Sequence, residues 1–144
     1  NNIERYSNYV NNLFVVVSDR DPRDLYIHEI QIPGGVIPID TIENFCNWYK
    51  ITRNHRKYET FEDNRIFIYF EDLIYKYDET SQKLKNFVGL SSENHIRKKQ
   101  VFNPQVSINN TRMWLRHPEC KKEIEYIEKN LGEYLYDYES LGLQ

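Results

Sequence analysis

A short run of apolar, mostly β-branched residues constrains the fold of this 144-residue chain more than any other feature. Leu13-Phe14-Val15-Val16-Val17 is apolar at every position, without the alternation of a half-exposed strand. Such a run is typical of a strand buried on both faces of a parallel sheet. The run ends at Ser18-Asp19-Arg20, and Asp21-Pro22 then predicts a helix start, because Asp favours the N-cap and Pro the first helical position.

A second buried strand is predicted at residues 65–70, Arg-Ile-Phe-Ile-Tyr-Phe. Between the two strands, residues 30–39 are rich in Pro and Gly and predict a loop. A helix is then expected from Asp40, which has capping-box spacing with Glu43, to about Lys57. Its apolar face consists of Ile42, Phe45, Cys46 and Tyr49. Strands that alternate with amphipathic helices indicate an α/β fold with a mainly parallel sheet.

The rest of the chain predicts helices joined by one irregular segment, residues 91–106. We expect Asp78 to cap a helix that ends at Gly89. Ser107 should cap a short helix that runs through Trp114, and the last helix should begin at Pro118. The first ten residues also predict a helix. Two strands make a poor sheet, so we expect residues 1–144 to be a single domain that belongs to a larger layered fold.

Composition excludes several classes of function. The net charge is −3, with nineteen Lys and Arg among twenty-two Asp and Glu, which argues against a general nucleic-acid binder. No apolar run has the length of a membrane span, and the first residues lack the layout of a signal peptide. Cys46 and Cys120 match no metal spacing. They indicate reduced thiols in a cytoplasmic protein without a metal, and one disulfide between them is the alternative.

Arg20 lies where an open α/β sheet binds ligands, at the carboxyl end of a strand and beside the start of a helix. Free backbone N–H groups favour an anion there, and the guanidinium fork fits phosphate oxygens. The alternative interpretation is structural. Arg20 and Arg23 would then pair with Asp19, Asp21 or Asp24 on a solvated surface.

The strand that runs into Arg20-Asp21-Pro22-Arg23-Asp24 resembles the 3′-phosphate-binding segment of sulfotransferases that use 3′-phosphoadenosine 5′-phosphosulfate (PAPS). In that family the first Arg of the motif and a Ser eight residues later hold the 3′-phosphate. The resemblance therefore assigns Arg20 to this phosphate. His28 stands at the position of the Ser, and its imidazole N–H is either a phosphate donor or an ordinary surface group.

Two further segments are similar to the same family. Tyr69-Phe-Glu-Asp-Leu73 resembles a strand ending in Tyr-Glu-Asp-Leu, and Phe87-Val-Gly-Leu90 resembles the stop of the helix that follows. We interpret Glu71 and Asp72 as structural groups rather than an acid–base pair.

The third segment, residues 95–114, resembles a C-terminal region of bacterial, carbohydrate-type sulfotransferases. There a basic pair leads into Phe-Asn-Pro-x-x-Ser-x-x-Asn-x-x-x-Trp, which matches Phe102 to Trp114. The resemblance places Arg97 and Lys98 over the 3′-phosphate, with Ser107 and Asn110 as further polar contacts. Lys99 replaces a Gly of the family. Alone, residues 97–99 would indicate only a solvated charge run.

The resemblance implies a partial P-loop-like three-layer fold and covers only the C-terminal portion of a sulfotransferase. The sequence holds no Gly-rich phosphate loop, and the family's catalytic base would fall before residue 1. We therefore expect a fragment that is inactive alone and supplies a half-site for PAPS. The acceptor is a hydroxyl or amine of a small molecule or carbohydrate, which the sequence leaves unidentified, as it does the oligomeric state. The alternatives are a non-catalytic binding module on a degenerate sulfotransferase scaffold and a small P-loop enzyme such as a kinase.

Overall fold

Two parallel strands lie at the centre of the computed structural model, which describes residues 9–58, 64–91, 93 and 95–143. Strand β1 (Val15–Asp19) pairs with β2 (Arg65–Tyr69), with Val15 opposite Arg65 and Asp19 opposite Tyr69. The mixed α/β class and the parallel pairing are confirmed. Most of the helix predicted for the first ten residues lies outside the described residues.

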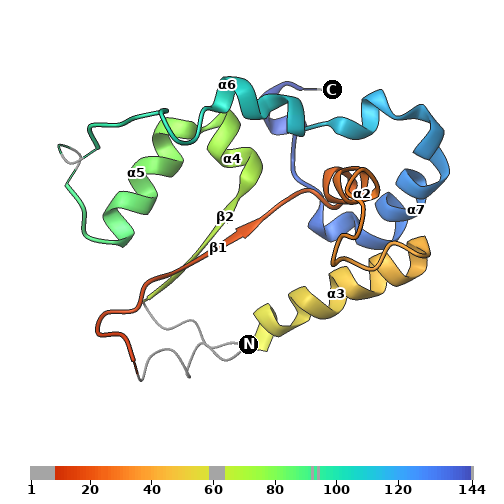
Figure 1. Cartoon of the computed structure of the whole chain (residues 1–144), viewed down its shortest axis with the longest axis horizontal. Coiled ribbons are helices and arrows are strands. Elements are labelled where there is room, and N and C mark those ends of the chain that lie inside the picture. Colours follow the sequence, from red (N-terminus) through yellow and green to blue (C-terminus); the bar gives the residue numbers. More distant parts are fainter. Residues whose placement is uncertain (1–8, 59–63, 92, 94, 144) are drawn as a thin grey trace.

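Helices lie on both sides of the strand pair (Figure 1). On one side are α2 (Pro22–Ile30), α3 (Ile42–Tyr58) and α7 (Lys121–Leu131). On the other are α4 (Phe70–Tyr75), α5 (Tyr77–Phe87) and α6 (Pro104–Ser107). Single 3₁₀ turns make up much of the C-terminal part: η2 (Ile108–Asn110), η3 (Met113–Arg116), η4 (Pro118–Cys120), η5 (Gly132–Tyr134) and η6 (Glu139–Leu141).

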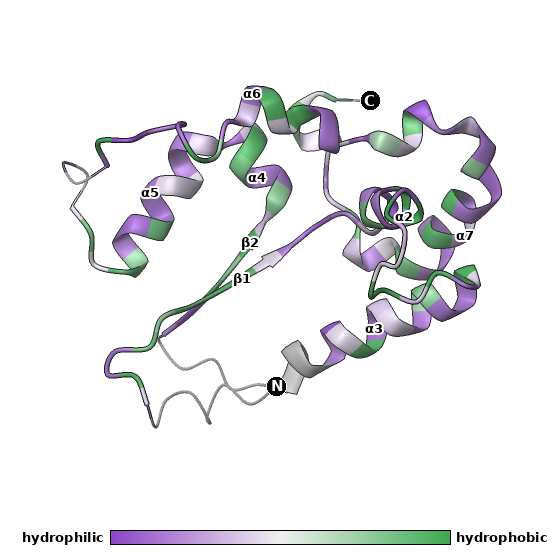
Figure 2. Cartoon of the chain, in the orientation of Figure 1, coloured by the Kyte–Doolittle hydropathy of each residue, from purple (hydrophilic) through white to green (hydrophobic). Residues whose placement is uncertain are grey.

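The main core lies between α2, α3 and α7. Its fully buried members are Ile27, Phe45, Tyr49, Ile127 and Leu131, all at 0% exposure. Figure 2 shows that α3 and α7 carry both apolar and polar residues, as expected of helices that cover a core with one face. The apolar spacing predicted for residues 42–49 therefore identified a true core face.

The expectation that β1 is buried on both faces is wrong. Val15 and Val17 are half-buried and Asp19 is buried, whereas Val16 and Ser18 are exposed, with the side chain of Val16 at 46%. One face of this strand is therefore partly covered and the other is open. A continuous apolar run alone does not reveal how many layers cover it.

Of the five predicted helix starts, those at Asp21 and Pro118 agree with the structure. Asp21 caps α2 as expected, and its Oδ1 accepts a hydrogen bond from the Arg23 N–H at 2.9 Å. Helix α3 begins at Ile42 instead, where the hydroxyl of Thr41 accepts from the Asn44 N–H at 3.2 Å. Helix α5 begins at Tyr77, so Asp78 lies in its first turn and is not the cap.

The predicted helix from Ser107 to Trp114 is also wrong. Asn103 caps α6, because its Oδ1 accepts from the Gln105 N–H at 3.0 Å and Pro104 occupies the first helical position. Ser107 is the last residue of α6, and 3₁₀ turns carry the chain onward. The last helix begins with the turn η4 and becomes α-helical at Lys121.

Leu131 provides a test of this core. Replacing the fully buried Leu131 with Ala should lower the free energy of unfolding by about 2–5 kcal/mol, because it leaves a cavity between α3 and α7. Leu115, which is 57% exposed, is the matched control and should lose about 0.5 kcal/mol or less as Leu115→Ala. Urea denaturation of both variants measures the difference. Equal losses would contradict this assignment of the core.

Candidate functional site

The candidate site is the corner where β1 ends and α2 begins. Asp19 is the last residue of β1, Arg20 follows, and Asp21 caps α2. The backbone of this corner is held from α3, because the Tyr49 hydroxyl donates to the carbonyl of Arg20 at 2.9 Å. The buried carboxylate of Asp19 pairs with Arg53 of α3 at 2.6 Å. Arg53 therefore neutralises Asp19, and Asp19 does not pair with Arg20.

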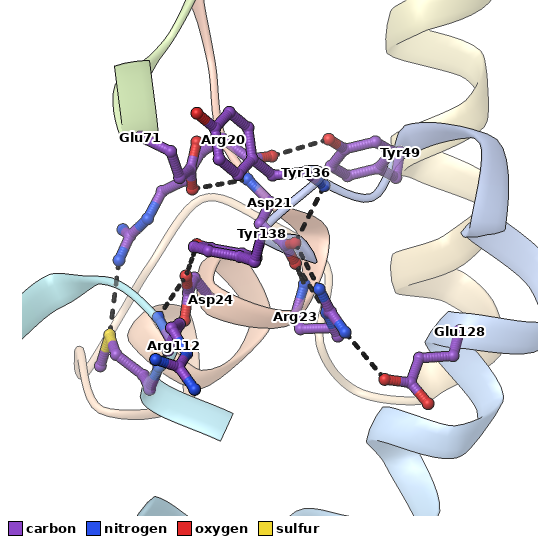
Figure 3. A network of polar contacts seen from close by, with 11 residues as sticks. Arg20, Asp21, Arg23, Asp24, Tyr49, Glu71, Arg112, Glu128, Tyr136 and Tyr138 are labelled. Atoms are coloured by element: carbon purple, nitrogen blue, oxygen red, sulfur yellow. Dashed lines mark hydrogen bonds and ion pairs between the residues drawn. The ribbon is translucent and has the colours of Figure 1, made fainter. Parts of the chain in front are cut away.

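Arg20 extends from this corner to the C-terminal part of the chain. Its Nη2 donates to the carbonyl oxygen of Asn110 at 2.5 Å and contacts Sδ of Met113 at 3.4 Å (Figure 3 shows the latter). The guanidinium carbon lies 5.1 Å from the ring centroid of Phe70. Its Nε is buried and has no hydrogen-bond partner among the described residues. Two of the motifs singled out in the sequence thus meet at Arg20.

Arg23, by contrast, has a structural role. It pairs with Asp21 at 2.8 Å and with Glu128 of α7 at 2.9 Å, and its guanidinium carbon lies 3.8 Å from the ring centroid of Trp114. These contacts join α2 to α7 and anchor the Trp114 segment. For Arg23, the alternative of pairing with a neighbouring Asp is therefore correct.

Three buried carboxyl groups lie behind Arg20 (Figure 3). Asp21, Asp24 and Glu71 are all 0% exposed, and each accepts a hydrogen bond from a distant backbone N–H. Glu71 Oε1 accepts from the Asp21 N–H at 3.0 Å, which ties α4 to the start of α2. Asp21 Oδ2 accepts from the Tyr136 N–H at 3.1 Å. The interpretation of Glu71 as a structural group agrees with these contacts.

Asp24 holds the segment that contacts Arg20. Its carboxylate accepts from the N–H groups of Met113 at 2.6 Å and Arg112 at 2.9 Å, and from the Tyr138 hydroxyl at 3.2 Å. Burial raises the pKa of Asp24 to about 6, with a further contribution from the charge of Asp21. Burial likewise raises the pKa of Glu71 to about 8.

The basic segment does not contact Arg20. Arg97 and Lys98 are exposed, and Lys98 forms an ion pair with Asp78 of α5. Aromatic rings connect the two regions instead, because Phe102 packs on Phe70 at 6.2 Å and on Tyr77 at 6.4 Å between ring centroids. Lys98 and Lys99 in turn lie over the Tyr77 ring.

The other predicted site residues include one that contacts Arg20 and others that do not. Asn110 contacts Arg20 through its backbone carbonyl oxygen. Ser107 is half-buried at the end of α6. His28 lies in the last turn of α2, and no hydrogen bond joins it to Arg20 in the described part of the chain. The structure thus brings Arg20 and Asn110 together and leaves His28, Arg97 and Lys98 apart from them.

Sequence reasoning missed the contacts of Phe70 and Phe102 near Arg20. The sequence predicts Phe70 as the last residue of a strand, whereas it is the first residue of α4. It predicts Phe102 only as part of the Phe-Asn-Pro motif. The signal available was that each aromatic residue lies within a motif that carries the resemblance.

The backbone at Lys99 has an unusual conformation for a residue with a side chain. Lys99 has φ of 61°, in the left-handed region that favours glycine. This is the position at which the resemblance leads us to expect Gly.

We predict that Lys99→Gly is more stable than Lys99→Ala by about 1 kcal/mol, because both variants lose the contact with Tyr77 but only Gly relieves the left-handed backbone. Thermal or urea unfolding of the two variants measures this difference. The same pair of substitutions at Gln100, whose φ is not positive, should reverse the order. An Ala variant at least as stable as the Gly variant at position 99 would contradict the prediction.

The raised pKa of Glu71 predicts how stability depends on pH. The folded state holds a proton that the unfolded state releases near pH 4.5, so this contribution is complete below that pH and is lost as pH rises toward about 8. Glu71→Gln cannot ionise and should remove this part of the slope. Its stability relative to the unsubstituted protein should therefore rise between pH 5 and pH 8 in denaturation measurements.

The exposed Glu139 is the control, since Glu139→Gln should leave the pH dependence nearly unchanged. If the pH profiles of Glu71→Gln and the unsubstituted protein run parallel, Glu71 does not carry this proton.

Comparisons with known proteins leave the family open. No family model, curated protein or solved structure matches the chain. The helices in the described ranges include none with both the length and the apolar character needed to cross a bilayer. Among the same residues, no three His, Cys, Asp or Glu side chains gather in a way that would hold a metal ion.

Proposed function

We propose that this chain forms the half-site for the 3′-phosphate of PAPS in a sulfotransferase, with Arg20 as the principal contact. One observation carries the proposal. Arg20 Nη2 reaches the carbonyl of Asn110, ninety positions along the chain, and so joins the Arg-Asp-Pro-Arg-Asp motif to the Phe-Asn-Pro segment. Both segments resemble phosphate-binding parts of the same family, and their contact at one guanidinium is what a shared phosphate site requires.

The charge of Arg20 supports this role. Its contacts are with a carbonyl oxygen, a thioether and an aromatic ring, and in the described part of the chain it forms no ion pair. Its buried Nε has no acceptor there. Arg23, three residues away, is neutralised by Asp21 and Glu128. Of the two motif arginines, Arg20 therefore retains the charge and the donor that an anion needs.

Cationic side chains carry the proposed contact more than the helix start does. Arg20 immediately precedes the N-cap of α2, a nine-residue helix whose Arg23 N–H already donates to Asp21. Arg97 and Lys98 would supply the second cationic group. The ion pair of Lys98 with Asp78 is exposed, at 51% and 71%, and exposed ion pairs are weak because water and salt screen them. A phosphate dianion would therefore compete readily with Asp78 for Lys98.

The remaining proposed contacts are weaker. Ser107 and Asn110 would offer polar groups on the Phe-Asn-Pro segment, and His28 would offer an imidazole N–H from α2. Ser107 and Asn110 would offer uncharged groups only and His28 comes last, so all three rank below the cationic Arg20, Lys98 and Arg97.

The reaction proposed for the complete enzyme is transfer of a sulfuryl group from PAPS to a hydroxyl or amine. The acceptor oxygen or nitrogen bonds to sulfur, a base takes its proton, and the bond from sulfur to the phosphate oxygen breaks. Adenosine 3′,5′-bisphosphate leaves, and cationic groups stabilise the charge that develops on its phosphate. The base and the 5′-phosphosulfate contacts are not assigned to residues of this chain.

The test compares two nucleotides that differ by one phosphate. Adenosine 3′,5′-bisphosphate should bind more tightly than AMP, because Arg20 and the Arg97–Lys98 pair contact only the additional phosphate. Arg20→Ala should remove most of this preference, since one charge-assisted hydrogen bond contributes about 1.5–3 kcal/mol. Isothermal titration calorimetry measures both affinities.

Lys122→Ala, on the exposed face of α7, is the control for loss of one positive charge and should keep the preference. Equal affinities for the two nucleotides in the unsubstituted protein would overturn the assignment of Arg20. Nucleotide preference without sulfuryl transfer by the full-length protein would instead favour the non-catalytic binding module.

A further inference from the structure

A cavity of about 400 Å³ lies between α4, α5 and the segment that follows α5. Its apolar lining consists of Leu73, Tyr77, Leu84, Leu90 and Phe102. The cavity is within the size range of small-molecule sites, which are mostly apolar with a few polar groups. Leu90 at its edge is 53% exposed, so the apolar lining continues to the surface.

The aromatic part of the lining favours a flat ligand. The rings of Tyr77 and Phe102 are nearly parallel, with an interplanar angle of 4° and centroids 6.4 Å apart. Aromatic ligands pack well against such rings by offset stacking or by edge contacts. Together with three leucine side chains, these rings form a surface suited to an aromatic body.

The polar groups of the cavity select for negative charge. Lys85 and His95 line it, and none of the described lining residues is acidic. Neither Lys85 nor His95 forms an ion pair with any other described residue. Of the two serines in the lining, Ser81 already donates its hydroxyl to the carbonyl of Tyr77. Ser91 is the other serine, and Lys85 and His95 are the basic groups of the lining that can meet a polar ligand.

We propose that this cavity binds a small aromatic monoanion, with its ring against Tyr77, Phe102 and the leucines and its charged group beside Lys85 and His95. The evidence is complementarity of shape and charge: an apolar, aromatic interior with only basic ionisable groups at its edge. The site is distinct from the Arg20 corner, because Phe70 and Phe102 lie between them. Nothing in the argument depends on PAPS.

The probe is 1-naphthoate, compared with the uncharged 1-naphthalenemethanol. We expect the anion to bind about five-fold more tightly, since a partly exposed ion pair contributes at most about 1 kcal/mol. Lys85→Gln should reduce this ratio to near one. Lys83→Gln, on the same helix but outside the cavity lining, removes the same charge and should leave the ratio unchanged. Calorimetry measures the affinities of both probes for the unsubstituted protein and for each of the two variants.

Methyl NMR locates the bound probe. Resonances of Leu73, Leu84 and Leu90 should shift on addition of 1-naphthoate, while that of Leu131 in the main core should not. Arg20→Ala should leave 1-naphthoate binding unchanged, which separates this site from the proposed nucleotide site. Absence of binding at millimolar probe, equal binding of the alcohol, or shifts elsewhere than these leucines would each overturn the proposal.

Discussion

Hydrogen bonds from backbone N–H groups to three buried carboxyl groups determine how this chain is assembled. Each of these groups, Asp21, Asp24 and Glu71, accepts a hydrogen bond from a backbone N–H that is remote in sequence. These bonds attach α4, the η3 turn and the C-terminal segment to the start of α2. Buried carboxylates are costly unless they are bonded in this way. The position of Arg20 follows from this arrangement, because Asp24 also holds Met113 beside it.

The same arrangement separates the two arginines of the motif by function. Arg23 faces the carboxylates of Asp21 and Glu128 and stabilises the packing of α2 on α7. Arg20 points toward neutral groups and keeps its charge. A single motif thus contains one structural arginine and one that is available to a ligand. The proposed phosphate site depends on this difference more than on the number of basic residues nearby.

The two proposed sites use different physical chemistry on either side of the Phe70–Phe102 contact. At the Arg20 corner, a fixed guanidinium without an ion-pair partner in the described part of the chain favours a compact, highly charged anion. In the cavity beside α5, apolar area would supply most of the binding energy, and Lys85 with His95 would supply selectivity for a negative charge. The ring pair keeps these environments apart.

The local features of this protein could be predicted from its residues, because each depends on neighbours in the chain. These features are the two strands, the Asp21 cap, the apolar face of α3 and the position of Arg20 at the end of a strand. Contacts between distant groups depend on the folded packing. Three contacts join residues that are distant in the sequence and that had several possible partners. They are the ion pair of Asp19 with Arg53, the hydrogen bond of Arg20 to Asn110 and the ion pair of Lys98 with Asp78. Spacing along a chain specifies a face, but only packing selects among those partners.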